Sequence, residues 1–146
     1  MLLENLTRLE YLCNTIPVLL NQLDENDFSN KPAPGKWSKK EILGHLIDSA
    51  TNNHHRWVRA QFEDIPVLSY DQNKWNEFSY YNGMPAQQVI SFWTAYNLQI
   101  AALIRLIPQQ NLQRLCGIGG QPVTLEWLFI DYVSHLEHHL KQIVDY

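Results

Sequence analysis

Four stretches of this 146-residue sequence carry apolar residues at helical spacing, and this periodicity constrains the fold most. The stretches run from about residue 2 to 23, from 38 to 61, from 85 to 107 and from 124 to 143. Each is long enough for several helical turns, and the segments between them, including the glycine-rich turn at 117–122, show no convincing strand pattern. Because short connections place neighbouring helices antiparallel, we predict an all-α four-helix bundle that forms one domain of residues 1–146.

Capping residues mark where three of these helices begin. Ser38 and Glu41 form a capping box, in which the serine accepts from a first-turn amide and the glutamate reaches back to the amide of the serine. Pro85 is a favourable first-turn residue, and Thr124 is the natural N-cap of the last helix. Pro17 lies inside the first pattern, so we expect it to kink or divide that helix.

The segment from 63 to 83 breaks the helical pattern and predicts a long crossover between the second and third helices. A short helical turn around 71–78 fits its sequence. Connections this long in a compact domain are often binding loops, so Tyr70, Trp75 and Tyr80 are candidate pocket walls. Alternatively, these aromatic side chains pin the crossover onto the bundle.

Composition excludes several classes of protein. The formal net charge is −4 and the 11 basic residues do not cluster, so no nucleic-acid-binding surface is visible. Charged residues interrupt the N-terminal stretch, which therefore resembles neither a signal peptide nor a membrane span. Cys13 and Cys116 stand apart, without the spacing of a disulfide framework or a metal-binding motif. We expect a protein of the reducing cytoplasm, with no membrane and no nucleic-acid partner.

Three of the six histidines lie inside the last predicted helix, within one span of five residues, 135–139. His135 and His139 are four residues apart and therefore occupy one face. On a helical wheel His139 falls inside the apolar stripe and His135 on its border, whereas His138 falls outside. Buried neutral imidazoles need polar partners, and a metal ion would provide one. The alternative is two core histidines that bind nearby side chains or carbonyl groups.

The second helix offers one more inward histidine. His45 lies at the edge of its inward face, and Asp48 follows three residues later on the same side. Three histidines from two helices would give three nitrogen ligands and leave one coordination position open, as in catalytic zinc sites. His54 and His55 diverge from His45 on the wheel, and we expect them to be exposed or to support the site without ligation.

Two motifs resemble a known family. They are Trp37-Ser38-x-x-Glu41-Ile42-x-Gly44-His45-Leu46-x-Asp48-Ser49 and Tyr132-x-x-His135-x-x-His138-His139-x-x-Gln142-Ile143. Together they are similar to the DinB/YfiT-like superfamily, the damage-inducible family that is unrelated to the DNA polymerase of similar name. The resemblance covers essentially the whole chain.

This resemblance implies more about the site than about the reaction. It implies a divalent metal, nickel or zinc, bound by His45, His135 and His139, and often a homodimer. Better understood members of the family are thiol S-transferases that use low-molecular-weight thiols such as bacillithiol, and a mycothiol-dependent isomerase. Many others are described only as hydrolases.

A metal held in this way has two plausible uses on a small-molecule substrate. It can lower the pKa of a bound water for hydrolysis, or bind a thiol as the reactive thiolate. Asp48 would orient His45 or act as a base, unless it is simply a solvated carboxylate. His138 would support the site without ligation, and we expect Asp131 and Glu137 to be solvated. The rival hypothesis is a non-catalytic bundle that contains metal structurally or binds a small ligand.

Overall fold

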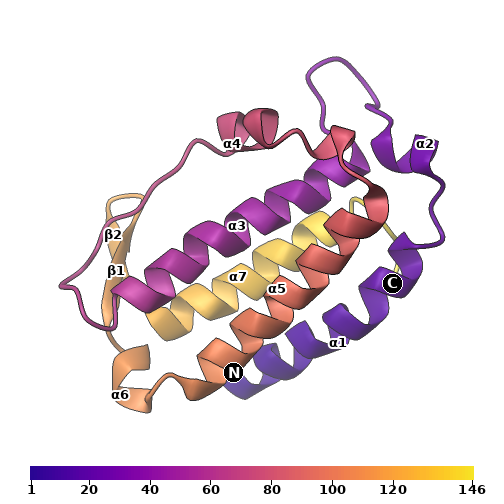
Figure 1. The fold of residues 1–146 in the computed structure, drawn as a ribbon. Helices are drawn as coiled ribbons and strands as arrows, with labels where there is room; N and C mark the ends of the chain where they lie inside the picture. Colours follow the sequence, from indigo (N-terminus) through magenta and orange to yellow (C-terminus); the bar gives the residue numbers. More distant parts are fainter.

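The computed structural model describes residues 1–146, and it confirms the predicted four-helix bundle (Figure 1). The four long helices are α1 (Leu2–Leu20), α3 (Lys39–Arg59), α5 (Ala86–Leu106) and α7 (Leu125–Leu140). The shorter elements are α2 (Glu25–Ser29), α4 (Gln72–Ser79), the 3-10 helix η1 (Tyr81–Gly83), α6 (Gln109–Leu112), β1 (Leu115–Ile118) and β2 (Gln121–Thr124). The long helices bury one contiguous apolar core of 31 residues.

The order in which the long helices pack is set by the crossover. α3 contacts α5 and α7, and α1 contacts the same two helices, so α1 and α3 lie at diagonal corners. Figure 1 shows that α3 and α5 run in the same direction, as do α1 and α7. The predicted crossover is therefore confirmed, because residues 60–85 carry the chain back along the bundle before α5 begins. The expected antiparallel packing holds for α1 with α5 and for α3 with α7 only.

The predicted helix starts are confirmed. Ser38 accepts from the amide of Glu41 and the Glu41 carboxylate accepts from the amide of Ser38, which completes the capping box of α3. The Thr124 hydroxyl accepts from the amide of Trp127 and caps α7. Pro17 does not divide α1, which ends three residues before the expected boundary. The polar connection that follows contains a short helix that the periodicity did not predict, α2, capped by the Asp24 carboxylate.

The glycine-rich turn was wrongly predicted to lack strands. β1 and β2 form an antiparallel hairpin in which Leu115 pairs with Thr124 and Ile118 pairs with Gln121. Gly119 and Gly120 connect the strands with φ values of +55° and +81°, a backbone conformation that glycine adopts without steric cost. Each strand has only four residues, too few for a reliable alternation of apolar and polar side chains.

Polar contacts hold the crossover against α3. The Arg56 guanidinium donates to the carbonyl of Leu68 at 2.6 Å, and the Asn76 amide donates to the carbonyl of Glu41 at 2.8 Å. The crossover also reaches the hairpin, where the amide of Gly117 donates to the carbonyl of Pro66 at 3.0 Å. These contacts fix the crossover over the α3 face that carries His45.

One helix is apolar enough to cross a membrane by length and composition. It is α5, whose most apolar 18-residue window has a mean hydropathy of 1.2. In the structure α5 packs against α1 and α3 and contributes Trp93, Ile100 and Ile104 to the core. Its composition is that of a core helix of the bundle.

Candidate metal centre

The structure brings His45, His135 and His139 together between α3 and α7. One ring nitrogen from each lies within 4.8 Å of the other two. Because α3 and α7 run antiparallel, the early part of α3 faces the late part of α7. The side chain of His45 is 1% exposed, whereas His135 and His139 are half-buried. The cluster is therefore buried on the α3 side and reachable from solvent on the α7 side.

All three imidazoles are held in the neutral form. Burial, together with the neighbouring imidazoles, lowers the pKa of His45 to about 3 and that of His135 to about 4. Burial also lowers the pKa of His139. A lowered pKa means that the rings are unprotonated at neutral pH. Neutral imidazole is the form that binds metal ions, so these donors would not have to lose protons first.

The spacing of one pair of ring nitrogens fits a tetrahedral ion. Zinc–nitrogen bonds of about 2.0–2.1 Å at tetrahedral angles place two ligand nitrogens about 3.3 Å apart. The Nε2 atoms of His45 and His135 are 3.3 Å apart. Three protein donors leave one position of a four-coordinate ion open. The residues present therefore fit the metal that their pattern predicts.

Gln142 and Trp37 support the outer side of this cluster. The Oε1 atom of Gln142 lies 3.1 Å from Nδ1 of His139, so a proton on Nδ1 would donate to it and leave Nε2 free as a donor. The amide nitrogen of Gln142 lies 3.5 Å from Nε2 of His138. The Trp37 ring lies 5.0 Å from the ring of His45. His138 itself is exposed and touches His139 through its ring, consistent with a supporting position outside the ligand set.

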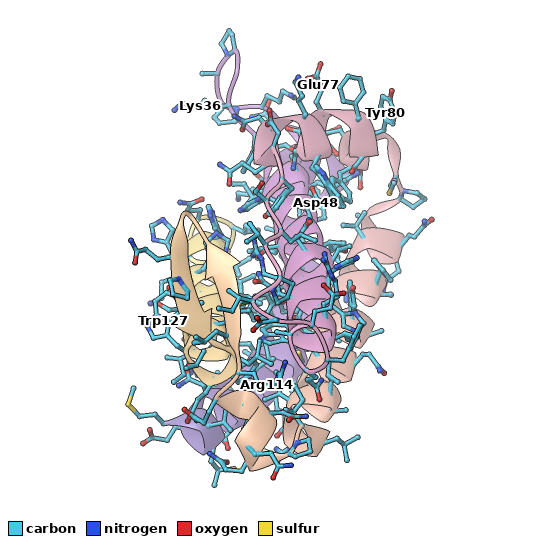
Figure 2. The ribbon with its side chains drawn as sticks, turned by 90° about the vertical axis from the view of Figure 1, so that its left-hand side faces the viewer. Lys36, Asp48, Glu77, Tyr80, Arg114 and Trp127 are labelled. Carbon is cyan, nitrogen blue, oxygen red and sulfur yellow. The ribbon has the colours of Figure 1, made fainter.

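Asp48 lies on α3 one turn after His45, and Figure 2 labels it among the side chains of that helix. It is 2% exposed, so it is not a solvated carboxylate. Its Oδ1 atom accepts from the Tyr81 hydroxyl at 2.5 Å, and its buried Oδ2 atom has no hydrogen-bond partner. Burial raises the pKa of Asp48 to about 6, and the Tyr81 hydrogen bond opposes this rise. No hydrogen bond joins Asp48 to His45, so the predicted orienting role has no direct contact behind it.

Tyr81 reaches Asp48 because residue 44 is glycine. A Cβ atom on Gly44 would lie 2.1 Å from Cδ2 of the Tyr81 ring, far inside van der Waals contact. The ring therefore lies directly on the backbone of α3, one residue before His45. This close approach explains the glycine next to the histidine in the first motif.

A family model described as the DinB superfamily matches residues 8–143 of the chain. The chain belongs to the DinB superfamily. This confirms the resemblance drawn from the two histidine motifs.

Relatives of this chain carry names that point to metal chemistry. A protein of Oceanobacillus iheyensis named "Putative metal-dependent hydrolase" is 29% identical over 150 residues, which cover 97% of this chain and 79% of the relative. A Bacillus subtilis protein named "Putative metal-dependent hydrolase YfiT" is 25% identical over 116 residues, which cover 76% of this chain and 64% of the relative.

Two solved structures share this fold. The structure of YfiT from B. subtilis, described as "a probable metal-dependent hydrolase with an unusual four-helix bundle topology", matches with a TM-score of 0.80 at 21% identity. The match covers 94% of this chain and 83% of that one. A DinB-like protein of B. subtilis matches with a TM-score of 0.65 at 14% identity, covering 96% of this chain and 87% of that one.

The predicted pocket residues of this DinB-superfamily chain are placed in different surroundings. Tyr70 is half-buried against Trp75, with 5.6 Å between the ring centroids. Trp75 is 39% exposed and lines a small surface hollow with Phe78. Tyr80 is 69% exposed and adopts a left-handed conformation at the end of α4, where Figure 2 shows it on the outer surface of the protein. These three aromatic residues do not converge on one pocket.

The other polar residues considered are now placed as well. His54 bonds the Tyr96 hydroxyl at 3.0 Å on the α5 side of α3, and His55 is exposed, so neither joins the cluster. Asp131 is exposed, as predicted. The prediction that Glu137 is solvated was wrong, because its carboxylate pairs with the Arg8 guanidinium at 2.6 Å. Arg8 lies 129 residues earlier, and this separation hides the pair from local patterns.

The supporting role of Gln142 was missed. Gln142 follows His139 by three residues and therefore shares its helical face. That spacing is visible in the sequence, and a ligand histidine usually bonds a polar group through its second nitrogen. The partnership of Tyr81 with Asp48 had no comparable signal, because it depends on how the crossover returns over α3.

Proposed function

We propose that this protein is a divalent-metal-dependent hydrolase of small molecules, with His45, His135 and His139 as the metal ligands. The observation that carries the proposal is the convergence of three neutral ring nitrogens within 4.8 Å. The names of the relatives support the reaction class, since they are described as metal-dependent hydrolases. Imidazole donors suit both zinc and nickel, so we propose one of these two ions.

A zinc or nickel ion in this place would act as a Lewis acid and lower the pKa of a water in its open position to about 7. Residues of the chain would set the charge at the ion, orient the ligands and accept the proton. Neutral imidazoles would leave the charge of the ion uncompensated, and Gln142 would hold the His139 ring in the tautomer that exposes Nε2. Asp48 would accept a proton on Oδ2, since Oδ1 is occupied by Tyr81 and a pKa of about 6 suits a base at neutral pH.

A thiol S-transferase is the second candidate. The same uncompensated charge would favour a thiolate as well as a hydroxide. Both cysteines are buried outside the cluster, and burial raises the pKa of Cys13 to about 12. The reactive thiol would therefore have to come from a small molecule rather than from the chain. A non-catalytic bundle with a structural ion is the remaining alternative.

Metal analysis of the purified protein tests the ligand assignment. We expect about one zinc or nickel per chain for the wild type and less than a tenth of that for His139→Ala. The control is His55→Ala, which removes an exposed imidazole of α3 outside the cluster and should retain the metal. A wild-type protein that refuses both ions in titration would remove the enzyme proposal.

Substrate screens on the loaded protein separate the reaction classes. Ester and amide hydrolysis that disappears in His139→Ala would support the hydrolase. Conjugation of a small thiol to an electrophile, lost in the same variant, would instead support the transferase. If neither appears and the ion resists exchange, the structural alternative gains.

We also infer that the chain acts as a homodimer in the cytoplasm. The unpaired buried cysteines fit a reducing compartment. Several large apolar side chains are exposed on the outer surface, among them Phe62, Val67 and Leu106, which are all at least 70% exposed. Sedimentation velocity tests the assembly, and a single species with the mass of one chain would contradict it.

A further inference from the structure

A pocket of about 410 Å³ opens beside the histidine cluster, at the end of the bundle where α3 begins and α7 ends. It is lined by Pro32, Gly35, Lys36, Trp37, Ile42, Gln72, Asn73 and Gln142. This volume lies within the range of small-molecule sites, about 300–1,000 Å³. Four segments build it: the loop before α3, the first turns of α3 and α4, and the turn after α7.

Two of the lining residues touch the proposed metal ligands directly. The Trp37 ring lies 5.0 Å from the ring of His45, and the Gln142 carbonyl lies 3.1 Å from Nδ1 of His139. Pocket and cluster therefore share two walls. Since His45 is almost completely buried, a small molecule would reach the cluster from this half-exposed side.

The charge that lines the pocket is positive only. Lys36 is the only charged residue that lines it, and no carboxylate does. The lysines close to Lys36 in the sequence are each paired with an acidic partner: Lys31 with Glu41, Lys39 with Asp27 and Lys40 with Glu25. Lys36 makes no ion pair, and Figure 2 shows it on the loop beyond the upper ends of α3 and α7. Lys36 is exposed, and its ammonium group is the one positive charge that lines the pocket.

We propose that this pocket is the substrate site and that it selects small molecules with a carboxylate, which pairs with Lys36 while the reacting end reaches the metal. The inference rests on the proposed function, because the metal defines the reacting end. The amides of Gln72 and Asn73 border the same space and offer further hydrogen bonds to a polar substrate. Lys36 is then a residue that determines specificity and takes no part in the chemical step.

Two thiols of equal length test the proposal on nickel-loaded protein. One is 3-mercaptopropionate and the other 3-mercaptopropan-1-ol, and their dissociation constants are read from the sulfur-to-nickel charge-transfer absorption. The wild type should bind the acid about fivefold more tightly than the alcohol, as expected for a partly solvated ion pair. Lys36→Met should abolish this preference, and Lys36→Glu should reverse it.

The control variant is Lys74→Met. Lys74 is an exposed lysine of α4 without an ion pair, and it lines a different surface hollow. It should retain the full preference for the acid, and raising the salt to about 0.5 M should reduce that preference through screening. A preference that persists in Lys36→Met, or a loaded protein that binds neither thiol, would overturn the inference. Failure to load nickel at all would instead count against the proposed function, and metal analysis before the titration separates the two results.

Discussion

At the scale of single residues, Asp48 is a buried carboxylate with one oxygen that lacks a hydrogen-bond partner, an arrangement that costs stability. Its only hydrogen bond comes from Tyr81, and no cation pairs with it. Burial disfavours its charged form, which is why its pKa rises to about 6. Groups that cost stability in this way are concentrated at functional sites, so Asp48 is where function and stability should be seen to oppose each other.

Asp48→Asn should therefore stabilise the protein at neutral and alkaline pH. The native carboxyl group has a raised pKa, so its favourable contribution is present at low pH and is lost as the pH rises through about 6. An amide has no such dependence and can still accept from Tyr81. Chemical denaturation at pH 8 should show a gain of up to about 3 kcal/mol, which shrinks toward zero by about pH 4.

The control for this comparison is Asp131→Asn, which changes an exposed carboxylate on α7 and should alter stability little at either pH. If Asp48→Asn is less stable than the wild type at pH 8, the carboxylate is better solvated than its burial indicates. If catalytic activity survives the substitution, Asp48 is not the base.

At the level of single residues, the histidine cluster could be predicted because the signal for it is local to each helix. Two histidines four apart on an apolar stripe, and a third at the edge of another stripe, depend only on helical periodicity. The ion pair of Glu137 with Arg8 and the hydrogen bond of Asp48 with Tyr81 depend on tertiary packing. Periodicity within one segment carries no information about either.

At the scale of elements, helix starts were predictable and the hairpin was not. A capping box is a four-residue signal, and α3 begins where that signal places it. The sequence does carry a turn signal for the hairpin, the adjacent glycines Gly119 and Gly120, which adopt positive φ in the structure. The strands on either side are short and one contains Pro122, so the strand pattern itself was weak. At Pro17 the sequence predicted a kink or a break, but α1 continues for three residues beyond it.

Ser38→Ala should measure what the start of α3 contributes. The Ser38 hydroxyl accepts from the amide of Glu41 at 3.0 Å and donates to the side chain of Asn82 at 2.6 Å. Its loss removes the cap and one contact with the end of the crossover, so the free energy of unfolding of the metal-free protein should fall by about 1–2 kcal/mol. Urea denaturation monitored by circular dichroism gives this value.

The matched control is Ser134→Ala, which replaces an exposed serine inside α7 and should be neutral within about 0.5 kcal/mol. Equal effects of the two substitutions would show that the cap contributes nothing beyond helix propensity.

At the scale of the whole molecule, the histidine cluster joins two helices that are held together elsewhere by apolar packing. α3 and α7 meet through Trp57, Phe129 and Tyr132 toward one end and through the histidines toward the other. The class of fold was predictable from four periodic segments, but their directions were not. A connection of about 25 residues can either turn back or run the length of the bundle, and its sequence does not distinguish the two.

A bound ion should therefore stabilise the entire bundle. Binding to the native state alone at one hundred times the dissociation constant contributes about 2.7 kcal/mol, which for a chain of this size raises the melting temperature by about 5–10 °C. Zinc or nickel should produce this shift in thermal unfolding, and a chelator should reverse it. His139→Ala should melt at the same temperature with and without the ion, whereas a shift that survives this substitution would mean that the ion binds elsewhere.

The positions of the two ends of the chain have a practical consequence. Residue 1 lies at the end of the bundle away from the histidine cluster, whereas residue 146 lies toward the cluster, only four residues after Gln142 (Figure 1). A polyhistidine purification tag attached after Tyr146 would bring additional imidazoles within reach of the proposed centre and could capture or strip its ion. The same tag placed before Met1 would be held at a distance by the length of α1, and it is the arrangement to use when metal content is measured.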